Sequence, residues 1–248
     1  MSQIQERTEI LLGQDGLDFL QSKHLLVVGV GGVGGAVTEA IARAGIGHIT
    51  LIDHDRVGLS NINRQLVATH ATLGMDKVAA MGERLMLINP ALNLTLRCEF
   101  VNRDHLDALL QAGGFDYVID CIDSVSCKAE LVAACQRFAI PVASSLGAGG
   151  RLDVSKVEMT TLEKTYNCGL ATNLRRKLRA LGMSLDYPVV FSGEYPIKPL
   201  PQQPVCDDPN VLPRAVNGTI SYMPNLFGFM LAGHVVRTLL MQSGRIKS

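Results

Sequence analysis

The segment from residue 25 to residue 43 constrains the fold of this chain more than any other. An apolar run at 25–28 leads directly into a turn with glycine at positions 29, 31, 32 and 34, and a helix-like segment follows as far as Arg43. A strand that turns on glycine into a helix gathers free backbone N–H groups at the positive end of the helix, where phosphate oxygens can approach closely. The segment therefore predicts a nucleotide-binding turn. The alternative is a glycine turn that only packs a helix against a sheet.

A second apolar stretch, 49–52, ends at Asp53. An acid at the end of the second strand of such a unit is placed to accept hydrogen bonds from ribose hydroxyls. The polar block that follows contains Asn61, Arg64 and Gln65, with Lys77 shortly after it. A planar guanidinium, an ammonium and neutral amides suit a triphosphate. In a nicotinamide dehydrogenase these phosphate-binding side chains would have no role, so we expect ATP as the nucleotide.

These motifs resemble those of the ThiF/MoeB/HesA family, the bacterial relatives of ubiquitin-activating enzymes, from about residue 7 to residue 146. The resemblance implies a Rossmann-like adenylation fold that activates a carboxylate with ATP and Mg²⁺. It implies that Asp53 holds the ribose and that Asn61, Arg64 and Lys77 hold the phosphates. Arg7 matches the arginine finger that reaches into the site of a partner subunit, which implies a homodimer. Asp123 matches the magnesium-associated acid.

The same assignments make chemical sense from the residues, because adenylation joins two anions and needs positive charge around the α-phosphate. We expect catalysis to depend on Arg7, Arg64, Lys77 and Asp123. We expect the nucleotide to contact Gly29, Gly31, Gly32, Gly34, Asp53, Asp55, Asn61, Arg64, Gln65, Lys77 and Ile122. The simpler alternatives are that Arg64 and Lys77 are solvated surface charges and that Asp123 is the N-cap of a helix.

Apolar periodicity predicts a single α/β domain with a doubly wound, mostly parallel sheet. Strands are expected near 25–30, 48–53, 94–100, 116–121 and 140–146, and helices near 4–21, 33–44, 75–88, 103–112 and 124–138. We expect residues 1–150 to form the nucleotide-binding core and residues 151–248 a small substrate-side extension. The extension has an expected strand near 154–160, a basic helix near 171–182 and a strand near 188–192. The apolar segment 223–241 carries Pro224, Asn225, His234 and Arg237, so we expect a core or dimer-interface helix rather than a membrane span.

The second half resembles the tRNA threonylcarbamoyladenosine dehydratase branch of the family in its segments 162–165, 173–179, 190–196 and 227–234. In that branch, ATP activates the carboxylate of a threonylcarbamoyl group on a tRNA adenosine, and the activated group closes into a ring. The alternative function is adenylation of the C-terminus of a small ubiquitin-like or sulfur-carrier protein. A third possibility is a noncatalytic nucleotide-binding partner module, which four retained site residues argue against.

The basic helix carries the cations that we expect to contact tRNA, because clustered cations release counterions from a phosphate backbone. These cations are Arg175, Arg176, Lys177 and Arg179. The alternative is a solvated helix face. Tyr166, Tyr187 and Tyr195 are candidates for stacking on a splayed base, or else residues that pack loops. A sulfur-relay or carrier protein is a further possible partner.

The six cysteines include no Cys-x-x-Cys pair, so we expect no structural zinc site. Cys98, Cys121, Cys127 and Cys135 lie in or next to expected core elements and are read as small hydrophobic residues. Cys168 and Cys206 lie in polar, loop-like sequence and are the candidates for a reactive thiol. Acidic and basic residues number 23 each, so no overall charge indicates a nucleic acid. The polar N-terminus, without an apolar signal segment, indicates a cytoplasmic protein.

Overall fold

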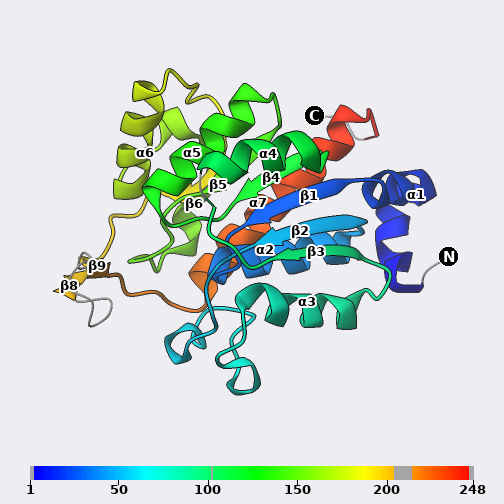
Figure 1. The fold of residues 1–248 in the computed structure, drawn as a ribbon, viewed down its shortest axis with the longest axis horizontal. Coiled ribbons are helices and arrows are strands. Elements are labelled where there is room, and N and C mark those ends of the chain that lie inside the picture. The colour runs from blue at the N-terminus through cyan, green and yellow to red at the C-terminus, as the bar shows by residue number, and fades with distance from the viewer. Residues whose placement is uncertain (1–2, 102, 204–213, 246–248) are drawn as a thin grey trace.

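A computed structural model describes residues 3–101, 103–203 and 214–245 of the 248-residue chain. Its centre is a seven-stranded sheet with the strand order β3-β2-β1-β4-β5-β7-β6 (Figure 1). The strands are β1 (His24–Val28), β2 (His48–Ile52), β3 (Asn93–Arg97), β4 (Tyr117–Asp120), β5 (Val142–Ser145), β6 (Val157–Thr161) and β7 (Pro188–Ser192). Every neighbouring pair is parallel except β6 and β7. The predicted α/β fold with a mostly parallel sheet is confirmed.

Helices cover both faces of the sheet. They are α1 (Glu6–Gln21), α2 (Gly32–Ala44), α3 (Lys77–Ile88), α4 (Arg103–Gly113), α5 (Val125–Arg137), α6 (Gly169–Ala180) and α7 (Tyr222–Gln242). The short 3-10 helices are η1 (Gln3–Gln5), η2 (Leu59–Asn61), η3 (His70–Thr72), η4 (Val154–Lys156) and η5 (Leu162–Lys164). Strands β8 (Leu200–Gln203) and β9 (Arg214–Val216) pair with each other in a separate two-stranded sheet. These bounds agree with the expected elements to within a few residues. The helix expected from residue 4 is interrupted at Gly13, whose φ is 69°.

Alternating side chains of the strands feed two separate cores. Leu25 and Val27 of β1 face the cluster formed with α2, α3 and α7, whereas Leu26 and Val28 face the cluster formed with α4, α5 and α6. Successive residues of a strand point to opposite faces, and parallel strands buried on both faces are therefore apolar throughout. This double burial explains why the apolar runs in the sequence located the strands.

The C-terminal helix α7 lies against α2 within the core. Gly228 permits this approach, because a Cβ at that position would lie 2.6 Å from the carbonyl oxygen of Val33 and 2.7 Å from Cβ of Ala36. Phe227, Leu231 and other side chains of α7 are buried in the same cluster as α2. The expectation of a core helix is confirmed. Among the described residues, none of the helices combines the length and the hydropathy that a membrane span requires.

The second half of the chain does not form a separate layer. Strands β6 and β7 extend the sheet that begins with β1, and β7 pairs directly with β5. The core therefore continues across residue 150, and the expected division of roles at that residue stays a prediction. The carboxyl ends of β1, β2, β4 and β5 meet at one edge of the sheet, where parallel α/β sheets bind ligands.

Candidate active site

The glycine-rich turn lies at the carboxyl end of β1 and is packed too closely for side chains. Gly29 has a φ of 91°, and a Cβ there would lie 2.9 Å from the carbonyl oxygen of Cys121. A Cβ on Gly34 would lie 1.7 Å from the carbonyl oxygen of Gly29. At Gly31 the nearest atom to such a Cβ is Nε2 of Gln65, at 3.7 Å, so this side of the turn has room for a ligand. The turn can therefore present backbone N–H groups and the N-terminus of α2 to phosphate oxygens.

Asp53 fixes the turn from the end of β2. Its Oδ2 accepts a hydrogen bond from the N–H of Val30 at 2.6 Å, and its Oδ1 accepts one from the N–H of Asp55 at 2.8 Å. The residue is only 9% exposed. Carboxylate oxygens have more than one acceptor position each, so Asp53 can still accept from ribose hydroxyls while it holds the turn.

Lys77 opens α3 and points back to the same edge. Its Nζ lies 2.7 Å from Oδ2 of Asp55, and its side chain is 8% exposed, against 52% for that of Asp55. The backbone N–H of Lys77 also donates to the carbonyl of Asp55 at 3.0 Å. The ion pair holds the ammonium beside Asp55, whose N–H donates to Asp53, and a phosphate bound at this edge would compete with Asp55 for the ammonium.

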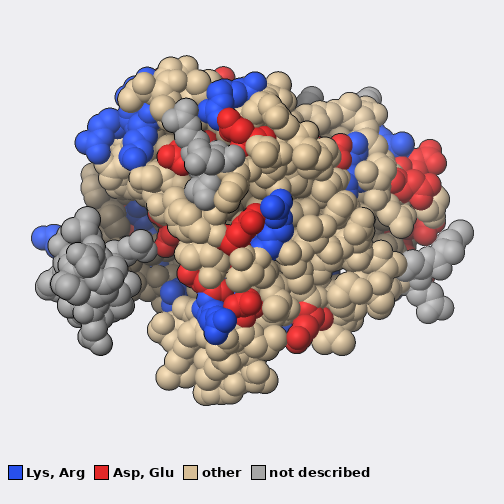
Figure 2. All heavy atoms as spheres, in the orientation of Figure 1, with Lys and Arg blue, Asp and Glu red and all other residues tan. Residues whose placement is uncertain are grey.

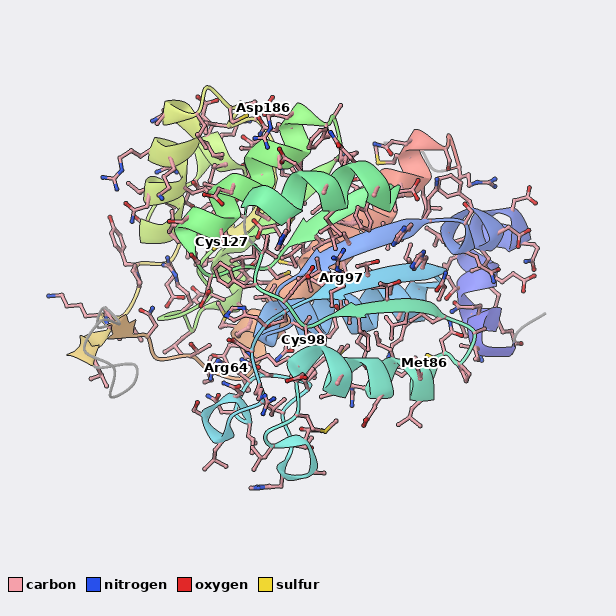
Figure 3. All side chains as sticks on the ribbon, in the orientation of Figure 1. Arg64, Met86, Arg97, Cys98, Cys127 and Asp186 are labelled. Carbon is pink, nitrogen blue, oxygen red and sulfur yellow. The ribbon has the colours of Figure 1, made fainter. Side chains whose placement is uncertain are left out.

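Arg64 and Asn61 belong to the loop between β2 and α3. Nη1 of Arg64 donates to the carbonyl of Ser60 and to Oδ1 of Asn63, both at 2.8 Å, while Oδ1 of Asn61 accepts from the N–H of Gly58 at 3.1 Å. Among the described residues, Nε and Nη2 of Arg64 have no partner, so its guanidinium keeps donors for a phosphate. Figure 3 shows Arg64 on this loop, below the strands and on the same side as Cys98.

Two buried amides at this edge have unused acceptors. Within the described residues, Oε1 of Gln65 and Oδ1 of Asn225 are buried without a hydrogen-bond partner. Nδ2 of Asn225 donates to the carbonyl of Arg64 at 3.3 Å, and a Cβ on Gly32 would lie 2.9 Å from Cβ of Pro224. Buried polar atoms without partners are rare and often mark a place where a ligand or water binds. The start of α7 therefore lies beside the glycine turn, which the sequence did not reveal because Gly32 and Pro224 are about 190 residues apart.

A buried ion pair supports the loop that carries Ile122 and Asp123. Nζ of Lys128 lies 2.7 Å from Oδ2 of Asp120, and both side chains are 0% exposed. Oδ1 of Asp120 accepts from the N–H of Ile122 at 3.1 Å, and Oγ of Ser144 donates to Oδ2 at 2.6 Å. The sequence predicted a role for Asp123 and none for Asp120 or Lys128. The available signal in the sequence was the spacing of this pair. Asp120 lies at the end of an expected strand, and Lys128 follows it by eight residues in the expected helix.

Asp123 itself is exposed at the carboxyl end of β4 and has no partner within the described part of the chain. The N-cap of α5 is Ser124, so the alternative that Asp123 caps this helix is wrong. One group of ligand atoms among the described residues is compact enough for a metal ion, namely Asp53, His54 and Asp55, with atoms within 4.8 Å of one another. Asp123 lies outside this group, and its association with magnesium stays a prediction.

Arg7 lies away from the other predicted site residues of its own chain. Gln5, two residues before Arg7, donates from Nε2 to the carbonyl of Arg43 at 3.2 Å. Arg43 lies in the last turn of α2, at the end of that helix opposite the glycine turn. Helix α2 has 13 residues, so about 20 Å separate its two ends. Arg7 is exposed at the amino-end edge of the sheet and cannot reach the glycine turn of the same chain.

The basic helix α6 presents most of its cations to solvent. Arg176, Lys177 and Arg179 are exposed, and Figure 2 shows Lys and Arg side chains gathered over the position of α6. Arg175 differs, because its Nη1 donates to the carbonyls of Leu162 and Thr165 at 3.3 and 2.9 Å. Arg175 therefore fastens α6 to η5, and its contact with tRNA stays a prediction.

Several other side chains lie where the sequence did not place them. Cys168, expected in polar loop surroundings, is buried at the start of α6, and Tyr187 is buried at the start of β7. Burial raises the pKa of Tyr187, and Asp120 adds to the shift.

Cys98, expected in the core, is exposed because it follows the edge strand β3. Tyr195 is 80% exposed, whereas Tyr166 packs edge-on against Phe191. Cys206 lies outside the described residues.

Comparisons with known proteins agree with the geometry of this edge. The ThiF family model matches residues 5–247. The chain is 36% identical over 252 residues to tRNA threonylcarbamoyladenosine dehydratase of Escherichia coli, with 96% of this chain and 94% of that protein covered. A crystal structure of the E. coli dehydratase in complex with ATP matches with a TM-score of 0.85 and 35% identity, over 97% of this chain and 95% of that one. The molybdopterin-synthase adenylyltransferase of Salmonella typhimurium is 36% identical over 164 residues, 65% of this chain and 64% of that protein.

Proposed function

This chain belongs to the ThiF family, and we propose that it is an ATP-dependent tRNA threonylcarbamoyladenosine dehydratase. The observation that carries the proposal is the assembly of the glycine turn, Asp53, Lys77 and Arg64 at one edge of the sheet. The similarity to the E. coli dehydratase extends through both halves of the chain, whereas that to the adenylyltransferase covers about two thirds of it. A tRNA substrate also accords with a cytoplasmic location.

The reaction has two steps that the site residues can support. The carboxylate of the threonylcarbamoyl group attacks the α-phosphorus of ATP, and pyrophosphate leaves. An oxygen or nitrogen of the same side chain then attacks the acyl carbon, the ring closes, and AMP leaves with the oxygen that the substrate loses. Arg64 and Lys77 offset the charge that accumulates on phosphate, and the glycine turn and Asp53 hold the nucleotide in line. The ring closure is intramolecular, so it needs no enzyme nucleophile.

Magnesium fits the donor set of this edge. Mg²⁺ is commonly held by one or two carboxylates together with substrate phosphates, and Asp123 is an exposed carboxylate without a partner among the described residues. When bound, the ion would neutralise part of the triphosphate charge and stabilise the leaving pyrophosphate. Asp123 is the residue that we assign to hold it.

The active unit that we propose is a homodimer in which each Arg7 enters the site of its partner. The position of Arg7 at the far edge of its own sheet supports this arrangement. Arg7→Ala and Lys77→Ala should each be inactive alone. Mixed and reassociated, they should recover about a quarter of wild-type activity, because half of the dimers pair one complete site with one dead site. No recovery in reassociated dimers would contradict the arrangement.

The exposed cations of α6 are the surface that we propose for tRNA. Charge reversal at Arg176 and Arg179 together should weaken tRNA binding about tenfold and flatten its salt dependence, while ATP binding stays unchanged. Arg237 is an exposed cation on α7 and supplies the matched control, since Arg237→Glu should leave both affinities unchanged. Equal tRNA affinity for the double variant and the wild type would remove α6 from the interface.

The competing function is adenylation of a small carrier protein, and the two differ in the carboxylate that is activated. AMP release should require tRNA that carries threonylcarbamoyladenosine and should not occur with unmodified tRNA or with a carrier protein ending in Gly-Gly. AMP release, or ATP–pyrophosphate exchange, with the carrier alone would favour the alternative. A sulfur-relay partner stays a prediction.

A further inference from the structure

Five large apolar or aromatic side chains lie exposed on loops next to the proposed active site. Leu152 follows β5, Tyr195 and Ile197 follow β7, and Ile220 and Tyr222 lie at the start of α7. Their exposed fractions range from 36% for Ile220 to 80% for Tyr195. We call these five residues the aromatic patch. A group of exposed apolar side chains indicates an interaction surface when its members are neighbours in space.

Hydrogen bonds show that the three segments of the patch are neighbours. The N–H of Gly150 donates to the carbonyl of Gly218, and the N–H of Ile197 donates to the carbonyl of Gly150, both at 2.8 Å. Gly150 has a φ of 69°, and a Cβ there would lie 2.9 Å from the carbonyl oxygen of Ile197, so the junction requires glycine. The hydroxyl of Tyr222 donates to the carbonyl of Leu152 at 3.0 Å, across 70 residues of sequence. The patch is therefore one surface, and the side chain of Tyr222 is held in place.

One side of the patch touches the loop that we propose for phosphate binding. Nδ2 of Asn63 donates to the carbonyl of Thr219, directly before Ile220, at 2.9 Å. Oδ1 of the same Asn63 accepts from Arg64 at 2.8 Å. A ligand on the patch thus lies beside the edge of the sheet where the carboxylate would be activated.

The other side of the patch leads to α6. Nδ2 of Asn167 donates at 2.9 Å to the carbonyl of Gly193, two residues before Tyr195. Helix α6 begins at Gly169, shortly after Asn167. The exposed cations of α6 lie about 10–15 Å further along the helix, at 1.5 Å per residue. An RNA whose phosphates contact α6 and whose modified base enters the site must therefore cross the patch.

The five tyrosines of the chain differ in what surrounds their rings. Tyr117 and Tyr187 are buried. Tyr166 packs edge-on against Phe191, and its hydroxyl donates to Glu158 at 3.3 Å. Both tyrosines of the patch are exposed. Of the three tyrosines that the sequence nominated for stacking on a base, Tyr195 is therefore the one with an exposed ring and no ring contact among the described residues.

Charges next to the patch suit an anionic partner. Arg151, directly before Leu152, is 3% exposed, and its Nε and Nη1 are buried without a hydrogen-bond partner among the described residues. An arginine side chain keeps its charge in proteins. Lys198 is exposed and forms no ion pair with the described part of the chain. The acids of the same loops, Asp153 and Glu194, accept hydrogen bonds from backbone N–H groups of these loops. Cations without an ion pair favour the phosphates of a nucleic acid.

We propose that Tyr195 and Tyr222 stack on the unpaired bases of tRNA that flank threonylcarbamoyladenosine. This inference rests on the proposed function and adds the surface that orients the substrate. Proteins recognise unpaired RNA bases by stacking them on aromatic side chains, and such stacking tolerates changes of base. The patch then holds the neighbouring nucleotides while the carboxylate of the modified adenosine enters the edge of the sheet.

The test measures equilibrium binding of a synthetic RNA hairpin that carries threonylcarbamoyladenosine in its loop. Tyr195→Ala should bind this hairpin about tenfold more weakly than the wild type, and Tyr195→Phe, which keeps the ring, should stay within about twofold. The affinity for ATP should be the same in all three proteins. Equal hairpin affinity of Tyr195→Ala and the wild type would overturn the proposal.

A second hairpin shows whether the ring and the bases act together. In it, the two nucleotides next to the modified adenosine are abasic. The wild type should bind it about tenfold more weakly than the intact hairpin, whereas Tyr195→Ala should bind both hairpins equally, because the stacking partner is already lost. Independent losses that add would overturn the proposal.

Leu87→Ala provides the matched control. Leu87 is 88% exposed on α3, and its neighbour Met86 lies well away from β8 and β9 in Figure 3. This variant should bind the hairpin like the wild type. Sedimentation of Tyr195→Ala as a smaller species than the wild type would assign the patch to a contact between copies of the chain and overturn the proposal.

The outcomes separate the patch from the proposed function. A wild type that binds ATP but not the modified hairpin would remove both. A wild type that releases AMP with modified tRNA, together with unchanged hairpin affinity in Tyr195→Ala, would remove the patch alone.

Discussion

Two buried cations at neighbouring strand ends differ in how their charge is balanced. Lys128, near the end of β4, forms a 2.7 Å ion pair with Asp120, and neither side chain is exposed. Arg151, after the end of β5, has two donors without a partner among the described residues and no carboxylate within ion-pair distance. The first arrangement is complete without any ligand and holds the loop of Ile122 and Asp123 in place. The second leaves two donors of a buried cation without a partner among the described residues.

The largest effect is expected at the balanced pair. Lys128→Met leaves the Asp120 carboxylate buried without its cation and should lower the free energy of unfolding by about 3–5 kcal/mol. Urea denaturation at pH 7 measures the loss. A loss within about 1 kcal/mol would contradict the account in which the charge of Asp120 depends on Lys128 for its balance.

A smaller effect is expected from the same substitution at the unbalanced site. Arg151→Met removes one hydrogen bond, worth about 1 kcal/mol, and also removes the cost of burying an unpaired charge, so the net change should stay within about 1 kcal/mol. The same urea titration is the measurement. A loss as large as that of Lys128→Met would erase the difference between the two sites and show that Arg151 has a strong structural counter-charge.

The smallest effect on stability is expected at the pair His24 and His48, whose side chains, unlike that of Arg151, lose a proton near neutral pH. The rings of His24 and His48 stack with centroids 3.5 Å apart. Burial lowers both pKa values, and the neighbouring His48 further lowers that of His24. The unfolded chain then binds more protons than the folded one, so stability should be complete above pH 6.5 and decline as the pH falls below it. His48→Asn should flatten this decline in unfolding measurements between about pH 5 and 7. Equal slopes for variant and wild type would contradict the stacked pair as the cause.

Local signals located the edge of the sheet where the predicted nucleotide residues lie. The glycine turn, Asp53 and Lys77 each follow an apolar run or open a helix, so their neighbours in sequence placed them at the correct edge. The Asp120–Lys128 pair was overlooked because a lysine on an amphipathic helix resembles a surface residue until the packing around it is known. The contact of Pro224 with Gly32 and the hydrogen bond from Arg151 to the carbonyl of Asn167 depend on tertiary packing between distant segments. Cys98 was misplaced for the same reason, since composition does not reveal which strand lies at an edge of the sheet.

The central claim is that this edge of the sheet activates a carboxylate on tRNA. Its most direct test is mass analysis of nucleosides from tRNA that carries threonylcarbamoyladenosine, after incubation with the protein, ATP and magnesium. We predict that the modified nucleoside loses one water, that AMP appears in equal amount, and that Asp123→Ala abolishes both. An unchanged nucleoside with the folded wild-type protein would contradict the claim.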